Sequence, residues 1–159
     1  MWHSIAFPVK DFDGDSISFT YDGAAGCELL QVNDALAAVE QMASDNPPHL
    51  AFDIVFVDAD KTRMMEYVDA LVSNDCVLKK GGLIIVDNVL WKGLVLDASS
   101  NGYDSSDEEN EDKALLKKNR RARKLANKMH RFNKAVVKDE RVEVLMMNLR
   151  DGLSMIRKH

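Results

Sequence analysis

The chain has little cysteine and no long hydrophobic run, and each shortage excludes a class of protein. Two cysteines, Cys27 and Cys76, are too few for a disulfide framework. This favours a reduced intracellular protein and predicts a cytoplasmic location. No apolar stretch approaches the roughly 20 residues that a membrane-spanning helix needs. Residues 1–8 lack the basic start and the long apolar region of a secretory signal, so we expect no membrane association.

An excess of positive charge is missing as well. The formal net charge is -5 at pH 7, which argues against a nucleic-acid partner. Hydrophobic residues make up 46% of the chain and charged residues 30%, a balance that is ordinary for globular proteins. With 159 residues the chain is long enough for one domain with its own core.

Two apolar runs end in oxygen-bearing side chains. Residues 52–57 lead into Asp58, and residues 83–86 lead into Asp87 and Asn88. In an open parallel sheet the carboxyl ends of the strands form the crevice where ligands bind. Three oxygen donors, with a lysine three residues after the first of them, suit a hard divalent cation such as Mg²⁺. The alternative is that these residues serve only as turn residues and helix caps.

Strands and helices alternate from residue 27 onward. Short strands are predicted at 28–32, 52–57 and 83–86. Asn33 or Asp34 caps a helix after the first strand, and a second helix covers about 62–72, because apolar residues there recur at helical spacing. This alternation predicts parallel βαβ units.

The last third of the chain has a different character. Residues 97–112 are rich in serine and acidic residues, which predicts a disordered surface loop, with a charged docking arm as the alternative. A long helix over about 113–137 has one apolar face and basic residues on most of its other faces. The apolar runs 142–147 and 153–156 flank an Asp-Gly step at 151–152, which predicts a hairpin.

Four strings follow one another in a characteristic order. They are FDIVFVDADK at 52–61, GGLIIVDNVLWKG at 81–93, Phe132-Asn133 and Asp151-Gly152-Leu153. They resemble the cation-dependent class I O-methyltransferases of the caffeoyl-CoA and catechol type. The resemblance covers about residues 27–96 and 113–158. It implies an α/β, Rossmann-like methyltransferase fold whose mainly parallel sheet ends in an antiparallel C-terminal hairpin.

The resemblance implies a metal centre and a base. Asp58, Asp87 and Asn88 align with the family's ligands for Mg²⁺ or another hard divalent cation, and Lys61 aligns with the general base of the catechol-type enzymes. A cation that chelates two vicinal hydroxyls lowers their pKa and fixes one oxygen for in-line methyl transfer. Lys61 would accept the remaining proton. The alternative for Lys61 is a first-turn lysine that pairs with an aspartate.

The resemblance also implies a cofactor side and an acceptor side. Ala35 matches a position near the adenine of S-adenosylmethionine, and Asp58 is predicted to contact the cofactor as well as the metal. The family's glycine two residues before Ala35 is Asn33 here. Trp91 matches an aromatic residue beside the acceptor pocket, although a packing role is an equal alternative.

The family's glycine-rich turn after the first strand is missing, and so is the acidic residue that binds the ribose hydroxyls. We therefore expect 1–159 to be a single, partial methyltransferase domain, incomplete in its N-terminal half. Residues 1–26 form a poorly defined N-terminal segment. The strand at 52–57 would normally pair with the absent first strand.

Two functional hypotheses follow. The first is an S-adenosylmethionine-dependent and cation-dependent O-methyltransferase that acts on a small hydroxylated aromatic substrate, a catechol-like or caffeoyl-type vicinal diol. As in many members of the family, a homodimer is possible. The second is a catalytically inactive remnant that binds a protein through the acidic loop and the basic helix. Binding of nucleic acid by that helix is disfavoured, because the net charge opposes it and no aromatic stacking platform accompanies it.

Overall fold

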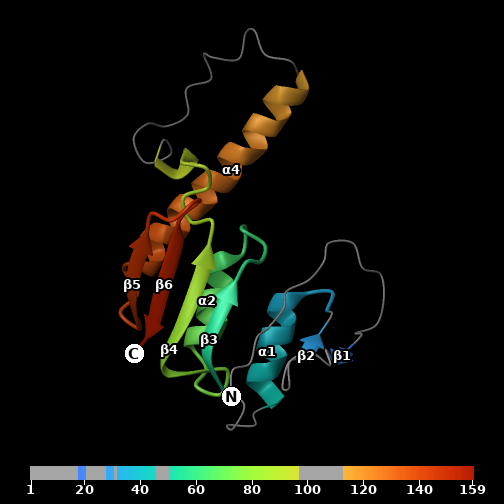
Figure 1. The fold of residues 1–159 in the computed structure, drawn as a ribbon, viewed down its shortest axis with the longest axis vertical. Helices are drawn as coiled ribbons and strands as arrows, with labels where there is room; N and C mark the ends of the chain where they lie inside the picture. The colour runs from blue at the N-terminus through green and yellow to red at the C-terminus, as the bar shows by residue number, and fades with distance from the viewer. Residues whose placement is uncertain (1–17, 21–27, 31, 46–50, 97–112) are drawn as a thin grey trace.

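The computed structural model describes residues 18–20, 28–30, 32–45, 51–96 and 113–159. The prediction for the acidic loop 97–112 lies outside these residues, and so does the N-terminal segment 1–26 apart from 18–20. Figure 1 shows a sheet of four strands with helices behind it, and a long helix that extends past the end of the sheet.

The four-stranded sheet has the order β3-β4-β6-β5. Its strands are β3 (Phe52–Val57), β4 (Leu78–Asp87), β6 (Leu153–Lys158) and β5 (Val142–Met147). β3 and β4 pair in parallel, whereas β4–β6 and β5–β6 pair antiparallel. The predicted α/β class and C-terminal hairpin are therefore confirmed. The sheet of the described residues is mixed rather than mainly parallel, because only one of its three pairings is a βαβ unit.

The predicted strand at 28–32 lies elsewhere. β2 (Glu28–Leu30) pairs antiparallel with β1 (Ser18–Thr20) in a separate two-stranded sheet. Its expected place in a parallel sheet is thus wrong for the described residues. A strand of three residues offers few backbone hydrogen bonds, and pairing with a segment nearby in sequence costs less loop-closure entropy than joining a distant sheet.

β4 begins five residues before its predicted start, so that Gly81 and Gly82 lie inside the strand. The register between β3 and β4 shifts between the pairs Phe52–Leu78 and Ile54–Leu83, and Gly81, which lies between Leu78 and Leu83, has φ +75. A glycine inside a strand often marks such a bulge. The glycines were expected before the strand, but the ladder continues through them.

The longer helices are α1 (Ala35–Asp45), α2 (Met64–Val72) and α4 (Lys113–Val136), and residues 94–96 are helical as well. Figure 1 shows α2 and α4 behind the sheet and α1 beside α2. Their apolar faces pack on the inward residues of the strands. The apolar residues that face the strands are buried: Leu36, Val39, Met64, Val68, Leu71, Val72, Ala126, Met129, Phe132 and Val136. Among the described residues, no helix has both the length and the apolar character to cross a membrane.

A buried lysine fastens the last strand to the core. The Lys158 ammonium donates hydrogen bonds to the Leu78 carbonyl oxygen at 2.9 Å and to the Leu71 carbonyl oxygen at 3.5 Å, and it pairs with Asp75 at 2.9 Å. The side chain of Lys158 is only 5% exposed. The hydrogen bond from Lys158 lowers the pKa of Asp75. These contacts tie β6 to both ends of the loop between α2 and β4.

Candidate functional site

The parallel register of β3 and β4 places two of the predicted metal ligands at one edge of the sheet. Val57 is paired with Val86, so Asp58 and Asp87 are the next residues of neighbouring strands. The Lys61 ammonium donates to Asp58 Oδ1 at 2.7 Å and to the Asp87 carbonyl oxygen at 3.2 Å. The Lys61 side chain is 10% exposed, whereas that of Asp58 is 54% exposed. Lys61 therefore bridges the ends of the two strands from a largely buried position.

The loop that follows β4 is held by residues from two other elements. The Val89 and Leu90 N–H groups donate to the carbonyl oxygens of Gly152 and Asp151 at 3.1 and 2.7 Å. The Asn133 side-chain amide donates to the Val89 carbonyl oxygen at 2.9 Å. Two of the strings that carried the family resemblance, 132–133 and 151–153, thus serve to position this loop.

Gly152 allows the hairpin to approach the loop. Its φ is +83, and a Cβ there would lie against the Leu90 side chain and 2.9 Å from the Leu90 nitrogen. Asn88 and Trp91 also adopt positive φ values, 61 and 45, in the same loop. Such values are uncommon for residues other than glycine and persist where the surroundings enforce them. The orientation of Asn88 and Trp91 is therefore set by the fold around them.

The chemistry of the donors at this edge fits a hard cation. Two carboxylates and an amide supply oxygen atoms, which Mg²⁺ prefers, and few protein ligands leave room for water and substrate. Asp87 Oδ1 accepts a hydrogen bond from the Asn88 N–H at 2.7 Å, so this carboxylate is turned toward its own chain. Among the described residues, no three acidic, histidine or cysteine side chains gather as a metal-binding group. A cation here would need Asn88 or water to complete its ligands.

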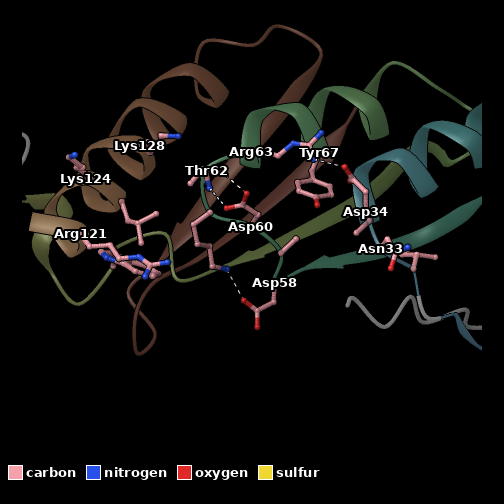
Figure 2. Close-up of a pocket in the computed structure, with 16 residues that line it drawn as sticks. Asn33, Asp34, Asp58, Asp60, Thr62, Arg63, Tyr67, Arg121, Lys124 and Lys128 are labelled. Atoms are coloured by element: carbon pink, nitrogen blue, oxygen red, sulfur yellow. Dashed lines mark hydrogen bonds and ion pairs between the residues drawn. The ribbon is translucent and has the colours of Figure 1, made fainter. Parts of the chain in front are cut away.

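A pocket of about 860 Å³ opens beside the sheet edge. Four of the predicted site residues line it: Ala35, Asp58, Lys61 and Trp91. Asp87 and Asn88 are not among the lining residues. Figure 2 shows three basic side chains of α4 on one side of the pocket, Asn33 and Asp34 on the other, and Asp58 and Asp60 between them. The cavity lining thus includes the predicted cofactor residue, base and acceptor residue but only one of the three predicted metal ligands.

The lining residues outside α4 that form hydrogen bonds or ion pairs with one another, which we call the paired wall, are Asp34, Asp58, Asp60, Lys61, Thr62 and Arg63. Asp34 caps α1, since its Oδ1 accepts from the Leu36 and Ala37 N–H groups at 2.9 and 3.2 Å. Its Oδ2 pairs with Arg63 at 2.9 Å. The hydrogen bond from Arg63, followed by that from the Ala37 N–H, lowers the pKa of Asp34. Of the two predicted caps, Asp34 therefore performs the role.

Asp60 begins the turn into α2. Its two carboxylate oxygens accept from the Thr62 N–H at 2.9 Å and the Thr62 hydroxyl at 2.8 Å. Burial acts to raise the pKa of Asp60, but these hydrogen bonds and the charges of Lys128 and Arg63 outweigh it and lower the pKa. Each of the three acids on the paired wall is thus stabilised in its charged form or held by an ion pair.

The opposite side, which we call the basic wall, consists of Arg121, Lys124 and Lys128 of α4. These residues lie three and four positions apart, so they share one helix face. Leu125 lines the pocket beside them. The sequence places all three on faces of the helix other than the apolar one. The spacing alone shows that they share a face, but only the tertiary arrangement shows that this face borders the pocket.

The position of Trp91 is compatible with both of its predicted roles. It lines the pocket and also packs against the hydrophobic core. Its indole N–H is buried, and within the described part of the chain it has no hydrogen-bond acceptor. Packing and contact with a ligand are therefore compatible at this position.

The chain belongs to the O-methyltransferase family, whose model matches residues 23–159. It is 32% identical over 127 residues to caffeoyl-CoA O-methyltransferase 2 of Populus trichocarpa, and 33% identical over 124 residues to that of Eucalyptus globulus. Each match covers 78% of this chain but only 43% of the relative. The chain thus spans less than half the length of these curated relatives.

Solved structures show the same fold. An SAH-bound methyltransferase of Podospora anserina superimposes with a TM-score of 0.64 at 21% identity, over 87% of this chain and 51% of the other. An O-methyltransferase from Streptomyces achromogenes involved in tomaymycin synthesis, solved with SAM, gives 0.56 at 23% identity, over 83% and 49%. The predicted Rossmann-like methyltransferase fold, present in part, is confirmed.

Proposed function

We propose that this chain carries the metal-binding and acceptor-binding side of an S-adenosylmethionine-dependent, cation-dependent O-methyltransferase. Its acceptor would be a small aromatic molecule with vicinal hydroxyls. The observation that carries the proposal is the edge of β3 and β4, where Asp58 and Asp87 come directly after the paired residues Val57 and Val86. Lys61 contacts the Asp58 carboxylate and the Asp87 backbone carbonyl there. Membership of the O-methyltransferase family supports the reaction type.

The residues of this edge suit the chemistry of methyl transfer to a hydroxyl oxygen. A divalent cation, when bound by Asp58, Asp87 and Asn88, would supply Lewis acidity that favours the ionised hydroxyl. In its neutral amine form, released from Asp58 by the bound cation, Lys61 would accept the proton of the attacking hydroxyl, because it lines the same pocket as Asp58. The rigid loop after β4 would hold the acceptor oxygen in line with the methyl donor.

We place the cofactor at the end of the pocket near the start of α1. Ala35 is 4% exposed and sits at the start of α1, where a small side chain lets a ligand approach closely. Asp58 lines the same cavity, so it would face both ligands. Helix starts and strand ends of open α/β sheets are where nucleotide-like cofactors bind.

Calorimetric titration of the folded protein with Mn²⁺ and Mg²⁺ tests the metal assignment. We expect binding by the unsubstituted chain and a loss of at least about 100-fold in affinity for Asp87→Ala, because metal ligands contribute more than the 10–100-fold typical of residues around them. Glu143→Ala is the matched control. Glu143 is an exposed acid whose partner in the ladder is Arg157, at the opposite end of β6 from Asp87.

Two outcomes would reject the proposal. The first is an absence of heat with any divalent cation in protein shown to be folded. The second is unchanged affinity in Asp87→Ala. Equilibrium dialysis with labelled S-adenosylmethionine tests the cofactor separately, and a homodimer and a cytoplasmic location remain predictions that sedimentation and localisation experiments can address.

A further inference from the structure

Asn88, one of the three predicted metal ligands, lies between two backbone carbonyls that side chains hold in place. The Asp87 carbonyl oxygen before it accepts a hydrogen bond from the Lys61 ammonium at 3.2 Å. The Val89 carbonyl oxygen after it accepts one from the Asn133 side-chain amide at 2.9 Å. These donors come from the turn before α2 and from α4, both distant from the loop in sequence. Tertiary contacts therefore fix the backbone on each side of Asn88.

The backbone that these contacts hold is strained. Among the described residues, the positions other than glycine with positive φ are Asn88, Trp91, Lys92 and Arg150. Three of them belong to the loop after β4, and the fourth directly precedes the two hairpin residues whose carbonyl oxygens the loop binds. Residues other than glycine keep such conformations where surrounding contacts outweigh the cost. We therefore expect the loop to relax when one of these contacts is removed.

Asn133 makes its contact with the loop although its own oxygen is left unsatisfied. The side-chain oxygen of Asn133 is buried and accepts no hydrogen bond from the part of the chain that the structure describes. A buried acceptor without a donor is unfavourable, whereas an apolar side chain at this position would have no such atom. The packing of α4 therefore does not by itself require an asparagine at 133. What the amide adds is the hydrogen bond to the loop.

We propose that Asn133 is a positioning residue for the metal centre, through the hydrogen bond from its amide to the Val89 carbonyl oxygen. This bond fixes the orientation of Asn88 as a ligand and that of Trp91 two residues beyond Val89. The inference rests on the proposed function, because it assigns Asn88 to the cation. Val89 is fully buried, so water cannot replace the amide as donor. Partners that orient a metal ligand without touching the metal typically change the affinity about 10- to 100-fold.

The first measurement is the affinity for Mn²⁺, titrated calorimetrically into the folded protein. Asn133→Ala and Asn133→Leu both remove the amide but differ in volume. We expect each variant to bind Mn²⁺ about 10-fold more weakly or worse. Asn127→Ala is the matched control, because Asn127 is an exposed residue of the same helix that does not line the pocket. It should bind Mn²⁺ as the unsubstituted chain does.

A second control separates positioning from a general loss of stability. Val136→Ala truncates a fully buried side chain about one turn further along α4. It should lower the urea concentration at the midpoint of unfolding, because it leaves a cavity, but it removes no hydrogen bond to the loop. We expect this variant to keep its affinity for Mn²⁺. Circular dichroism shows whether each variant is folded.

The remaining measurement follows the loop itself through the fluorescence of Trp91. The sequence has two tryptophans, so Trp91 is the sole one in a Trp2→Phe background. Trp91 packs against the hydrophobic core, and a relaxed loop should expose its indole. We therefore expect acrylamide to quench the fluorescence more strongly in both Asn133 variants than in Asn127→Ala, in metal-free protein.

The outcomes distinguish this inference from the proposed function. Absence of Mn²⁺ binding by the folded, unsubstituted chain rejects the proposed function and the inference with it. If that chain binds Mn²⁺ and both Asn133 variants bind it equally well, the inference is overturned and the proposed function stands.

Three further results would overturn the inference alone. A loss of affinity in Asn133→Ala but not in Asn133→Leu would assign the residue to packing. An equal loss in Val136→Ala would make the effect one of stability. Weaker Mn²⁺ binding with unchanged quenching of Trp91 would show that the effect does not pass through the loop.

Discussion

The two walls of the pocket differ in whether the protein satisfies its own charges. On the paired wall, Asp34, Asp58 and Asp60 each accept hydrogen bonds from neighbours at 2.7–3.2 Å. On the basic wall, no acid of the described residues forms an ion pair with the three cations. The paired wall is thus held by its own hydrogen bonds and ion pairs, whereas the three cations of the basic wall have no ion-pair partner among the described acids.

The largest effect is expected at Lys61. Under the proposed function, Lys61→Ala should reduce kcat about 100-fold or more, because a positioned general base contributes at least that much. Affinity for the divalent cation should not fall, since the ammonium no longer competes for Asp58. Steady-state kinetics and Mn²⁺ titration measure the two quantities.

Lys61→Arg is the matched control for this prediction. Arginine keeps the positive charge beside Asp58 but cannot give up its proton in a protein. It should therefore be as inactive as alanine. An arginine variant with normal kcat would show that Lys61 only balances charge and that the paired wall has no catalytic base.

The next largest effect is expected at Gly152, which supports the loop that bears Trp91. Gly152→Ala should lower the free energy of unfolding by about 1–3 kcal/mol, because the new Cβ meets Leu90 at a positive φ. Urea denaturation measures the loss. Gly93→Ala is the control, since Gly93 has φ +79 but no atom within 4 Å of its added Cβ. If both variants lose the same stability, the close approach at Leu90 contributes nothing.

The smallest effect is expected at Asp34. Asp34→Ala should cost about 1 kcal/mol through loss of the α1 cap. Asp34→Asn retains a capping oxygen and should lose less, because the exposed pair with Arg63 is screened by solvent. Thermal unfolding of the unsubstituted chain and the two variants measures the stability that each substitution costs.

The contribution of the Asp34 charge to the free energy of unfolding should decrease as the pH falls. The pKa of Asp34 lies below its ordinary value of 3.8, with the hydrogen bond from Arg63 as the main cause. The stabilisation is therefore fully present above about 3.8 and disappears as the pH falls through the lowered pKa. The difference in free energy of unfolding between the unsubstituted chain and Asp34→Asn should therefore become smaller in acid. A difference that grows below pH 4 would contradict this assignment.

Much of the paired wall was predictable because it lies on short-range patterns. The strand at 52–57 ends where predicted, and Asp58 follows β3 while Asp87 ends β4, its parallel partner. An apolar run followed by acidic residues is visible in the sequence, and the parallel βαβ unit determines which strand ends meet. The predicted hairpin around Gly152 formed for a similar reason, since an Asp-Gly step is a local signal.

The features that were missed depend on tertiary structure. The strand at 28–32 has no local signal for its partner, and it pairs with Ser18–Thr20 instead of joining the main sheet. The bulge at Gly81 belongs to the register between two strands rather than to either alone. The basic wall was missed because helical periodicity separates apolar from polar faces, but it does not show which polar face borders a cavity.

The buried hydrogen bonds of the Lys158 ammonium have a practical consequence for the experiments above. Lys158 is the second-to-last residue, yet its ammonium reaches two carbonyl oxygens in the interior, and the His159 N–H donates to the Arg141 carbonyl oxygen at 2.9 Å. Trimming even two residues from this end would leave those oxygens without their donor. Affinity tags should therefore follow His159, which is exposed, and leave residues 158 and 159 in place.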